Sequence, residues 1–105
     1  MIFHFRTTNV TFFEEDQAYF EEKLSTLVKF LGNEAGDEDT VDAHISLSKN
    51  KHESGNRFEA HATVSCAHHG KFHTEVEADN IKKCADIIED KLGVQMKKFH
   101  DKHKG

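Results

Sequence analysis

The stretch that decides the fold is VDAHISLS, residues 41–48, in which apolar and polar side chains alternate strictly. This period of two is typical of a β-strand with one buried side and one solvent-facing side. The same alternation returns in FEAHATVSC, residues 58–66, and in FHTEVEA, residues 72–78. Residues 50–56 and 68–70 each contain a glycine among polar residues, which is typical of hairpin connections. The middle of the chain therefore predicts three consecutive antiparallel strands.

Helical periodicity is found on both sides of these strands. Residues 13–31 repeat apolar side chains at the spacing of one helix face, and Gly32 follows as a candidate C-cap. A second amphipathic segment begins at Asp79 or Asn80, either of which can cap a helix, and extends to about residue 100. The pattern thus predicts one helix before the three strands and one after them.

The N-terminal segment IFHFR, residues 2–6, alternates as well and predicts a further strand. The predicted element order is β-α-β-β-β-α, an α+β fold with a four-stranded mixed sheet. A right-handed crossover through the first helix makes the first two strands parallel neighbours. Both helices must pack on one face of the sheet, because each strand has only one apolar side. We expect residues 1–105 to form a single domain whose outer sheet face is polar and open.

The charge is unevenly distributed along the chain. The formal net charge is −5, from 14 basic and 19 acidic residues, which taken alone disfavours nucleic-acid binding. Residues 1–40 carry three basic and nine acidic side chains, whereas residues 80–105 carry seven lysines and four acidic side chains. A local positive field can attract a polyanion even when the whole molecule is negative. The second helix is therefore the candidate surface for phosphate groups.

Several function classes are disfavoured by the motifs that the sequence lacks. It contains no P-loop, no dinucleotide-binding fingerprint and no nucleophile elbow, so we expect neither an enzyme nor a cofactor or small-molecule substrate. No apolar run approaches the roughly 20 residues that span a bilayer, so no membrane partner is expected. Cys66 and Cys84 both fall on apolar faces, which favours buried thiols in a reducing, cytoplasmic environment.

Segments along nearly the whole chain resemble the ribosome hibernation promoting factor family, also called the ribosome-associated inhibitor or sigma-54 modulation family, in its short form. The similar segments are NV (residues 9–10), KL (23–24), ISLSK (45–49), ATV (62–64) and, most specifically, ADIIEDKL (85–92) followed by Gln95 and KK (97–98). Lys82 and Val94 stand where the family often has tyrosine and arginine. The family's fold agrees with the element order predicted above.

The resemblance implies a non-enzymatic protein that binds the small ribosomal subunit and its ribosomal RNA. It would occupy the decoding channel and repress translation under stress or in stationary phase. The dimerising domain of the long form is not seen, so the protein is not expected to bridge ribosomes by itself. A monomer is expected when the protein is free. The residues that the resemblance assigns to RNA phosphates are Lys23, Lys29, Lys49, Lys82, Lys83, Lys91, Lys97, Lys98 and Lys102.

Other interpretations remain open at this stage. The lysines also fit an ordinary solvated helix face with cations near its C-terminus. The open sheet face or the acidic loop, residues 33–39, could bind a protein partner. His44, His61 and His73 all alternate onto the exposed sheet face and could in principle bind zinc, although scattered surface histidines are the simpler reading and no metal site is expected.

Overall fold

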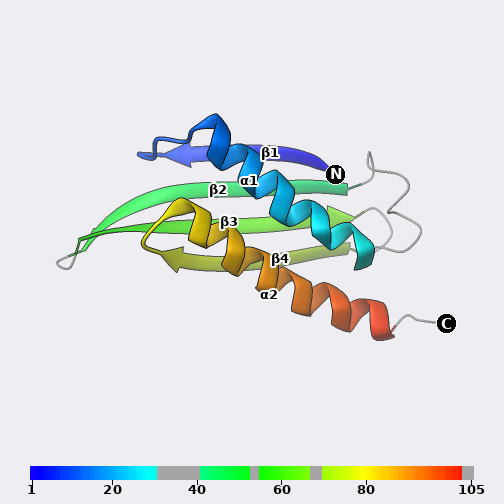
Figure 1. The fold of residues 1–105 in the computed structure, drawn as a ribbon. Coiled ribbons are helices and arrows are strands. Elements are labelled where there is room, and N and C mark those ends of the chain that lie inside the picture. Colours follow the sequence, from blue (N-terminus) through cyan, green and yellow to red (C-terminus); the bar gives the residue numbers. More distant parts are fainter. Residues whose placement is uncertain (31–40, 53–54, 67–69, 103–105) are drawn as a thin grey trace.

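The computed structural model describes residues 1–30, 41–52, 55–66 and 70–102 (Figure 1). Its elements are β1 (Ile2–Thr8), α1 (Glu14–Ser25), a short 3₁₀ helix (Thr26–Phe30), β2 (Val41–His52), β3 (Gly55–Cys66), β4 (Gly70–Ala78) and α2 (Ile81–Lys102). The predicted β-α-β-β-β-α order is confirmed. The predicted acidic loop, residues 33–39, lies outside the described residues, as does Gly32.

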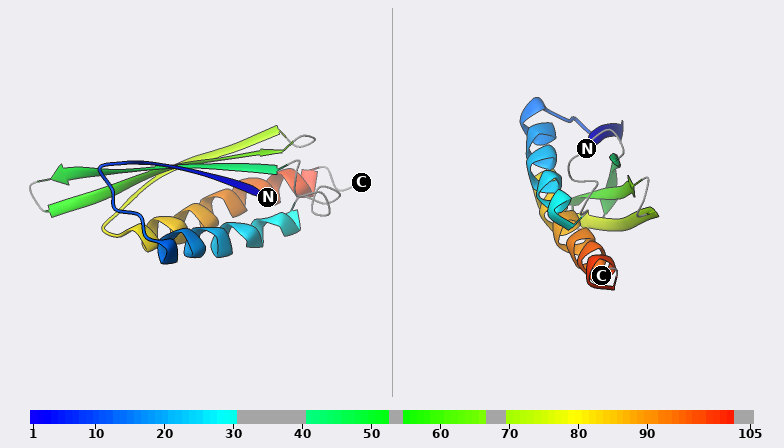
Figure 2. Two further views of the ribbon diagram at one scale, coloured as in Figure 1. Left: turned by 90° about the horizontal axis from the view of Figure 1, so that it is seen from above. Right: turned by 90° about the vertical axis from the view of Figure 1, so that its right-hand side faces the viewer.

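The four strands form one mixed sheet in the order β1-β2-β3-β4. β1 is parallel to β2, and the two following pairs are antiparallel, as predicted. Both helices lie on the same face of the sheet and run side by side in the same direction (Figure 2). None of the described helices or strands covers the opposite face of the sheet (Figure 2).

The hydrophobic core lies between the sheet and the helix pair. The inward positions of β2, β3 and β4 are almost all buried, in the period of two that the sequence predicts. Phe20, Leu24 and Leu27 cover this face from the first helical segment, and α2 covers it with a long apolar stripe. The largest fully buried side chains of α2 are Ile88, Leu92 and Met96. Burying each such side chain contributes about 1.5–3 kcal/mol before the entropy of ordering is counted.

The first helix is shorter than predicted. It begins after Phe13, whose backbone N–H donates to the Asp16 carboxylate at 3.2 Å, so the acidic first turn satisfies one otherwise unpaired donor. The prediction of a single helix over residues 13–31 is wrong, because α1 ends at Ser25 and continues as a 3₁₀ helix. The Ser25 hydroxyl donates to the Glu21 carbonyl, and Thr26 Oγ1 lies 2.7 Å from the Lys23 carbonyl oxygen. Such hydroxyl bonds compete with the regular helical pattern at this point.

The β2–β3 hairpin is longer than predicted. Residues 50–56 were expected to form a loop, but Asn50 pairs with Arg57, Lys51 with Asn56, and His52 with Gly55. The prediction is wrong because an antiparallel ladder is held by backbone hydrogen bonds and needs no apolar side chain at its outer end. The two strands therefore extend beyond the helix layer on the left of Figure 2.

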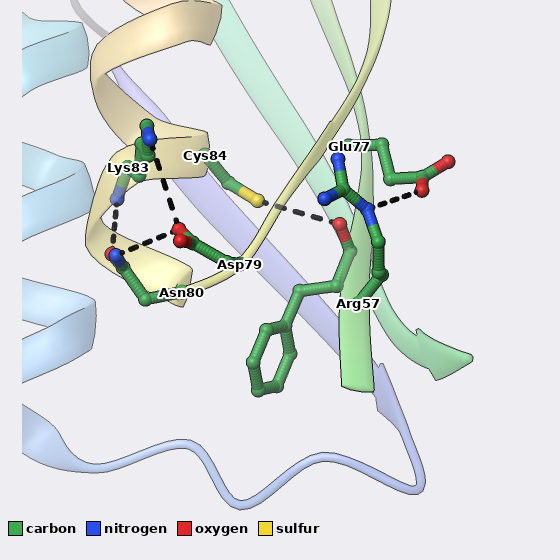
Figure 3. Close-up of polar contacts among 7 residues, drawn as sticks. Arg57, Glu77, Asp79, Asn80, Lys83 and Cys84 are labelled. Carbon is green, nitrogen blue, oxygen red and sulfur yellow. Dashed lines mark hydrogen bonds and ion pairs between the residues drawn. The ribbon is translucent and has the colours of Figure 1, made fainter. Parts of the chain in front are cut away.

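The N-terminus of α2 is capped by Asn80. Its side-chain oxygen accepts a hydrogen bond of 2.8 Å from the Lys83 backbone N–H, and Lys83 also pairs with Asp79 at 3.8 Å (Figure 3). This decides between the two predicted caps. Cys84, in the first turn, is fully buried and its Sγ donates to the Phe58 carbonyl at 3.7 Å (Figure 3). The helix start is thereby tied to β3.

Both cysteines are buried, as the sequence predicts. Burial raises the pKa of the Cys84 thiol to about 11, so this thiol keeps its proton at neutral pH. Within the described residues, no helix is long and apolar enough to cross a membrane.

Candidate nucleic-acid interface

The predicted lysines all come from the helix side of the sheet. Lys23 lies on α1, Lys29 on the 3₁₀ helix and Lys49 on the inward-facing side of β2, in step with the buried Leu47. The remaining six lie on α2. The structure therefore places the set on one side of the molecule, but it spreads the set along that side. No single cluster holds all of the described lysines.

On α2 the lysines fall on three separate lines, because seven residues make almost two helical turns. Lys83 and Lys97 share one line, and Lys91 and Lys98 share another. Lys82 stands alone on a third line that faces α1, where it reaches the Tyr19 ring. Lys97 and Lys98 are both exposed on the C-terminal half of the helix. The side chain of Lys102 lies outside the described residues.

A polar network joins α1 to α2. Tyr19 donates a hydrogen bond of 2.6 Å to Asp86 Oδ1, and Lys23 Nζ lies 3.6 Å from the same carboxylate oxygen. Lys23 and Lys82 approach the Tyr19 ring, with Nζ-to-centroid distances of 5.4 and 5.9 Å. Thr26 Oγ1 lies 2.7 Å from Glu89 Oε2 and equally close to the Lys23 carbonyl oxygen, so its one proton is donated to either acceptor at a time. Two of the predicted RNA-binding lysines therefore also stabilise the contact between the helices.

The pKa values within this network are shifted upward. The hydrogen bond to Asp86 raises the pKa of Tyr19, because ionising the phenol would place a second negative charge beside the carboxylate. The pKa of Lys23 is raised first by its charge interaction with Tyr19, and then by the carboxylates of Asp86 and Glu89. Tyr19 is thus neutral and Lys23 positively charged at neutral pH.

A hollow of about 510 Å³ lies where the two helices begin. Lys49 and Lys82 line it together with Phe13, Phe58 and the acidic residues Glu15 and Asp16. Phe13 is 60% exposed, and Lys49 Nζ lies 5.8 Å from the centroid of the Phe58 ring. The same hollow is lined by Asn9, which has a φ of 57°, a left-handed conformation that asparagine tolerates better than most residues. Cations beside exposed aromatic rings are the combination that binds phosphates and unstacked bases.

Lys29 and Lys91 occupy different surroundings. Lys29 Nζ lies 5.2 Å from the centroid of the neighbouring Phe30 ring. Lys91 reaches across to the sheet, where Nζ lies 3.5 Å from the main-chain carbonyl oxygen of Glu75. The stem of Lys91 therefore runs along the edge of the molecule while its ammonium group stays at the surface.

Two residues of this surface were missed by the sequence analysis. Tyr19 lies one helical turn before Lys23, and that spacing of four could have indicated that the two side chains meet. Phe13 was predicted only as the start of a helix, and no sequence pattern places it beside Lys49, which comes from a strand 36 residues later. Only the fold brings these side chains to one hollow.

The sheet-face histidines divide into two groups. His44 stacks on His4, with ring centroids 4.4 Å apart, whereas His61 lies near His73, with centroids 6.3 Å apart. The predicted trio of His44, His61 and His73 is therefore not brought together as one ligand set. The sheet's register explains this, because Thr63 stands between His44 on one side and His73 on the other.

One known protein family matches nearly the whole chain. The family described as "Sigma 54 modulation protein / S30EA ribosomal protein" matches residues 3–104. The chain belongs to this family. A member of the sigma-54 modulation family is a ribosome-associated modulation factor, and the family is not a known enzyme family. The resemblance inferred from the sequence is thereby confirmed.

A solved structure of similar fold supports the architecture of this family member. The N-terminal domain of Protein Y from Thermus thermophilus superposes with a TM-score of 0.72 at 22% sequence identity. The match covers 94% of this chain and 99% of that domain. Among curated proteins, no sequence matches the chain.

Proposed function

We propose that this protein binds the small ribosomal subunit in its decoding channel and represses translation there without catalysing a reaction. The observation that carries the proposal is the family match over residues 3–104, which makes the chain a ribosome-associated modulation factor. A protein in that channel would occupy the space of messenger and transfer RNA. The occasion would be stress or stationary phase, the protein would be cytoplasmic, and it would be monomeric when free.

The charge of the two helices supports one orientation. α1 carries five acidic side chains and one lysine, so it would be repelled by ribosomal RNA. The C-terminal half of α2, residues 91–102, carries four lysines and one acidic side chain. We therefore propose that α2 faces the RNA and that α1 is turned away from the densest phosphate.

In this orientation, the nine predicted lysines would make different kinds of contact with the RNA. Lys83, Lys91, Lys97, Lys98 and Lys102 would contact phosphates from α2 as mobile point charges. Lys49 and Lys82 would bind RNA at the hollow beside Phe13, where an unpaired base could stack. Lys23 would contribute less, because it is already engaged with Asp86, and Lys29 would be a flanking contact.

The test is competition for the channel. Labelled protein is titrated onto vacant small subunits and onto subunits already loaded with messenger RNA and initiator transfer RNA. We expect binding to the loaded subunits to be at least about tenfold weaker, because the ligands occupy the same space. Equal affinity for vacant and loaded subunits would place the protein elsewhere on the ribosome and contradict the proposed mechanism.

A further inference from the structure

The uncovered face of the sheet carries a group of three ligand-type side chains on β3 and β4. His61 is the direct cross-strand partner of Glu75, and His73 lies two residues before Glu75 on the same side of its strand. All three side chains are exposed, and they alternate with the buried residues that face the helices. Of the predicted RNA-binding lysines, Lys91 lines one hollow together with His61 and Glu75, so the group borders the lysine surface at that residue.

The donor atoms of this group converge on one point. His61 Nδ1 lies 3.2 Å from Glu75 Oε1, and His73 Nε2 lies 3.6 Å from the same oxygen. Zinc–ligand bonds of 2.0–2.1 Å at tetrahedral angles put neighbouring ligand atoms about 3.4 Å apart. The two measured distances lie on either side of that value. All three donor atoms lie within 4.8 Å of one another.

A hydroxyl orients one of the imidazole rings. Thr63 Oγ1 lies 2.7 Å from His73 Nδ1, which leaves Nε2 of the same ring directed at Glu75. Nε2 is free to bind a metal in the tautomer in which His73 Nδ1–H donates to Thr63 Oγ1, and metal-binding histidines usually donate from their second ring nitrogen in this way. The side chain of Thr63 therefore supplies the support that a bound ion would need.

Side chains of α2 contact the backbone of β4 at His73 and Glu75, two of the three proposed ligands. Gln95 of α2 donates a hydrogen bond of 2.8 Å to the main-chain carbonyl of His73. Lys91, also on α2, lies 3.5 Å from the main-chain carbonyl of Glu75. β4 is an edge strand, and these two contacts hold it at the residues concerned. The spacing of the ligands is thus set by the sheet and by α2 together.

A second group on the same face has the same composition but a different geometry. His4 Nε2 lies 3.0 Å from Asp42 Oδ1, and His44 completes the group. The rings of His4 and His44 stack at an interplanar angle of 10°, so their in-plane lone pairs run side by side. The rings of His61 and His73 are inclined at 45°, which lets their lone pairs meet. The second group is therefore a natural control for the first.

We propose that His61, His73 and Glu75 form a binding site for a transition-metal ion of the Zn²⁺ class. Two imidazoles and one carboxylate are an established ligand set for this ion, with the remaining position open to water or to a group from a partner. The ion joins β3 to β4 across the open face. The protein ligands replace water molecules on the ion, any proton on the ligating atoms is released to solvent, and no electron moves.

The test uses untagged protein and zinc chloride in isothermal titration calorimetry, with a cobalt titration followed by absorption spectroscopy. We expect one strong site in the unaltered protein. The double variant His61→Gln/His73→Gln should lose at least about tenfold in affinity, as should Thr63→Val through its effect on ring orientation. The matched variant His4→Gln/His44→Gln removes the same number of histidines and should keep its affinity within about twofold.

Circular dichroism and thermal unfolding without metal provide the control for folding, since all four histidines are exposed. The proposal is overturned if the unaltered protein binds no zinc at concentrations up to about 100 µM. It is also overturned if the two double variants lose equal affinity, because binding would then reflect histidine content alone. None of these measurements involves the ribosome, so their outcome is independent of the proposed function.

Discussion

The Tyr19 hydroxyl donates a 2.6 Å hydrogen bond to the Asp86 carboxylate, and this bond joins α1 to α2 across 67 residues of sequence. Both helices pack on the same hydrophobic core, whereas this hydrogen bond lies at the solvent-facing edge of the contact between them. It positions the carboxylate between a phenol and the ammonium group of Lys23. The contact between the helices therefore has a polar component that can be removed without altering the core.

Replacing Tyr19 by phenylalanine removes only the hydroxyl. A hydrogen bond to a carboxylate is stronger than one between neutral groups, but solvent screens it where the pair is exposed. We therefore expect Tyr19→Phe to lower the free energy of unfolding slightly but measurably in urea titrations. In a double-mutant cycle, the effect should disappear when Asp86 is already alanine. An equal loss in both backgrounds would show that the hydroxyl acts through another group.

The Cys84 thiol makes stability depend on pH in the alkaline range. Its pKa rises from the ordinary 9.0 to about 11 on folding, so the folded state keeps a proton that the unfolded state loses. The stabilising contribution is fully present below pH 9 and is lost as pH rises toward 11. We expect the free energy of unfolding to fall by up to about 1.4 kcal/mol per pH unit in this window from this group.

The control for this pH dependence is Cys84→Ala. Other groups titrate in the same range, so the decisive quantity is the difference between the two slopes. The alanine variant should be less stable at neutral pH and should show a shallower decline above pH 9. Identical slopes for both proteins would mean that the thiol ionises equally well in the folded state.

Gly93 is a position where a methyl group should stabilise the protein. It lies inside α2, and an added Cβ would meet Leu27 Cδ2 at 3.6 Å, which is an ordinary van der Waals distance. Alanine in a helix interior is favoured over glycine by about 1 kcal/mol. We expect Gly93→Ala to raise the free energy of unfolding by about 0.5–1 kcal/mol. Urea titration of the variant measures this change directly.

Gly70 provides the opposite case. Its φ of 83° lies in the left-handed region, although an added Cβ there would meet no atom within 4 Å. We expect Gly70→Ala to destabilise the protein by about 1 kcal/mol through backbone strain alone. If both alanine variants changed stability in the same direction, either the helical environment of Gly93 or the left-handed conformation of Gly70 would be incorrect.

The strands were predictable from the sequence because each has one buried side, which imposes a period of two on the side chains. The end of α1 was not predictable, since it depends on hydroxyl bonds from Ser25 and Thr26 that compete with the helix. The hairpin ends were missed because backbone pairing leaves no apolar signature.

For the lysines, composition identified α2 as basic. Only the fold shows that Lys23 forms an ion pair with Asp86 and that Lys49 and Lys82 line the same hollow.

The histidines illustrate the same limit. Alternation correctly placed His44, His61 and His73 on the exposed sheet face. Alternation does not give the register between strands, and it is the register that pairs His4 with His44 and His61 with Glu75. A ligand set composed of neighbours across strands therefore requires the structure.

The most direct test of the central claim is co-sedimentation with purified small ribosomal subunits at several salt concentrations. Lys97→Glu/Lys98→Glu reverses two charges on α2, and Arg6→Glu/Lys71→Glu reverses two exposed charges on the opposite side of the molecule. Both variants change the net charge equally. We expect the first to bind about tenfold or more weakly and to lose roughly 1–2 units from the slope of log affinity against log salt. The second should bind like the unaltered protein, and equal losses in the two variants would contradict the assignment of α2 as the RNA-facing surface.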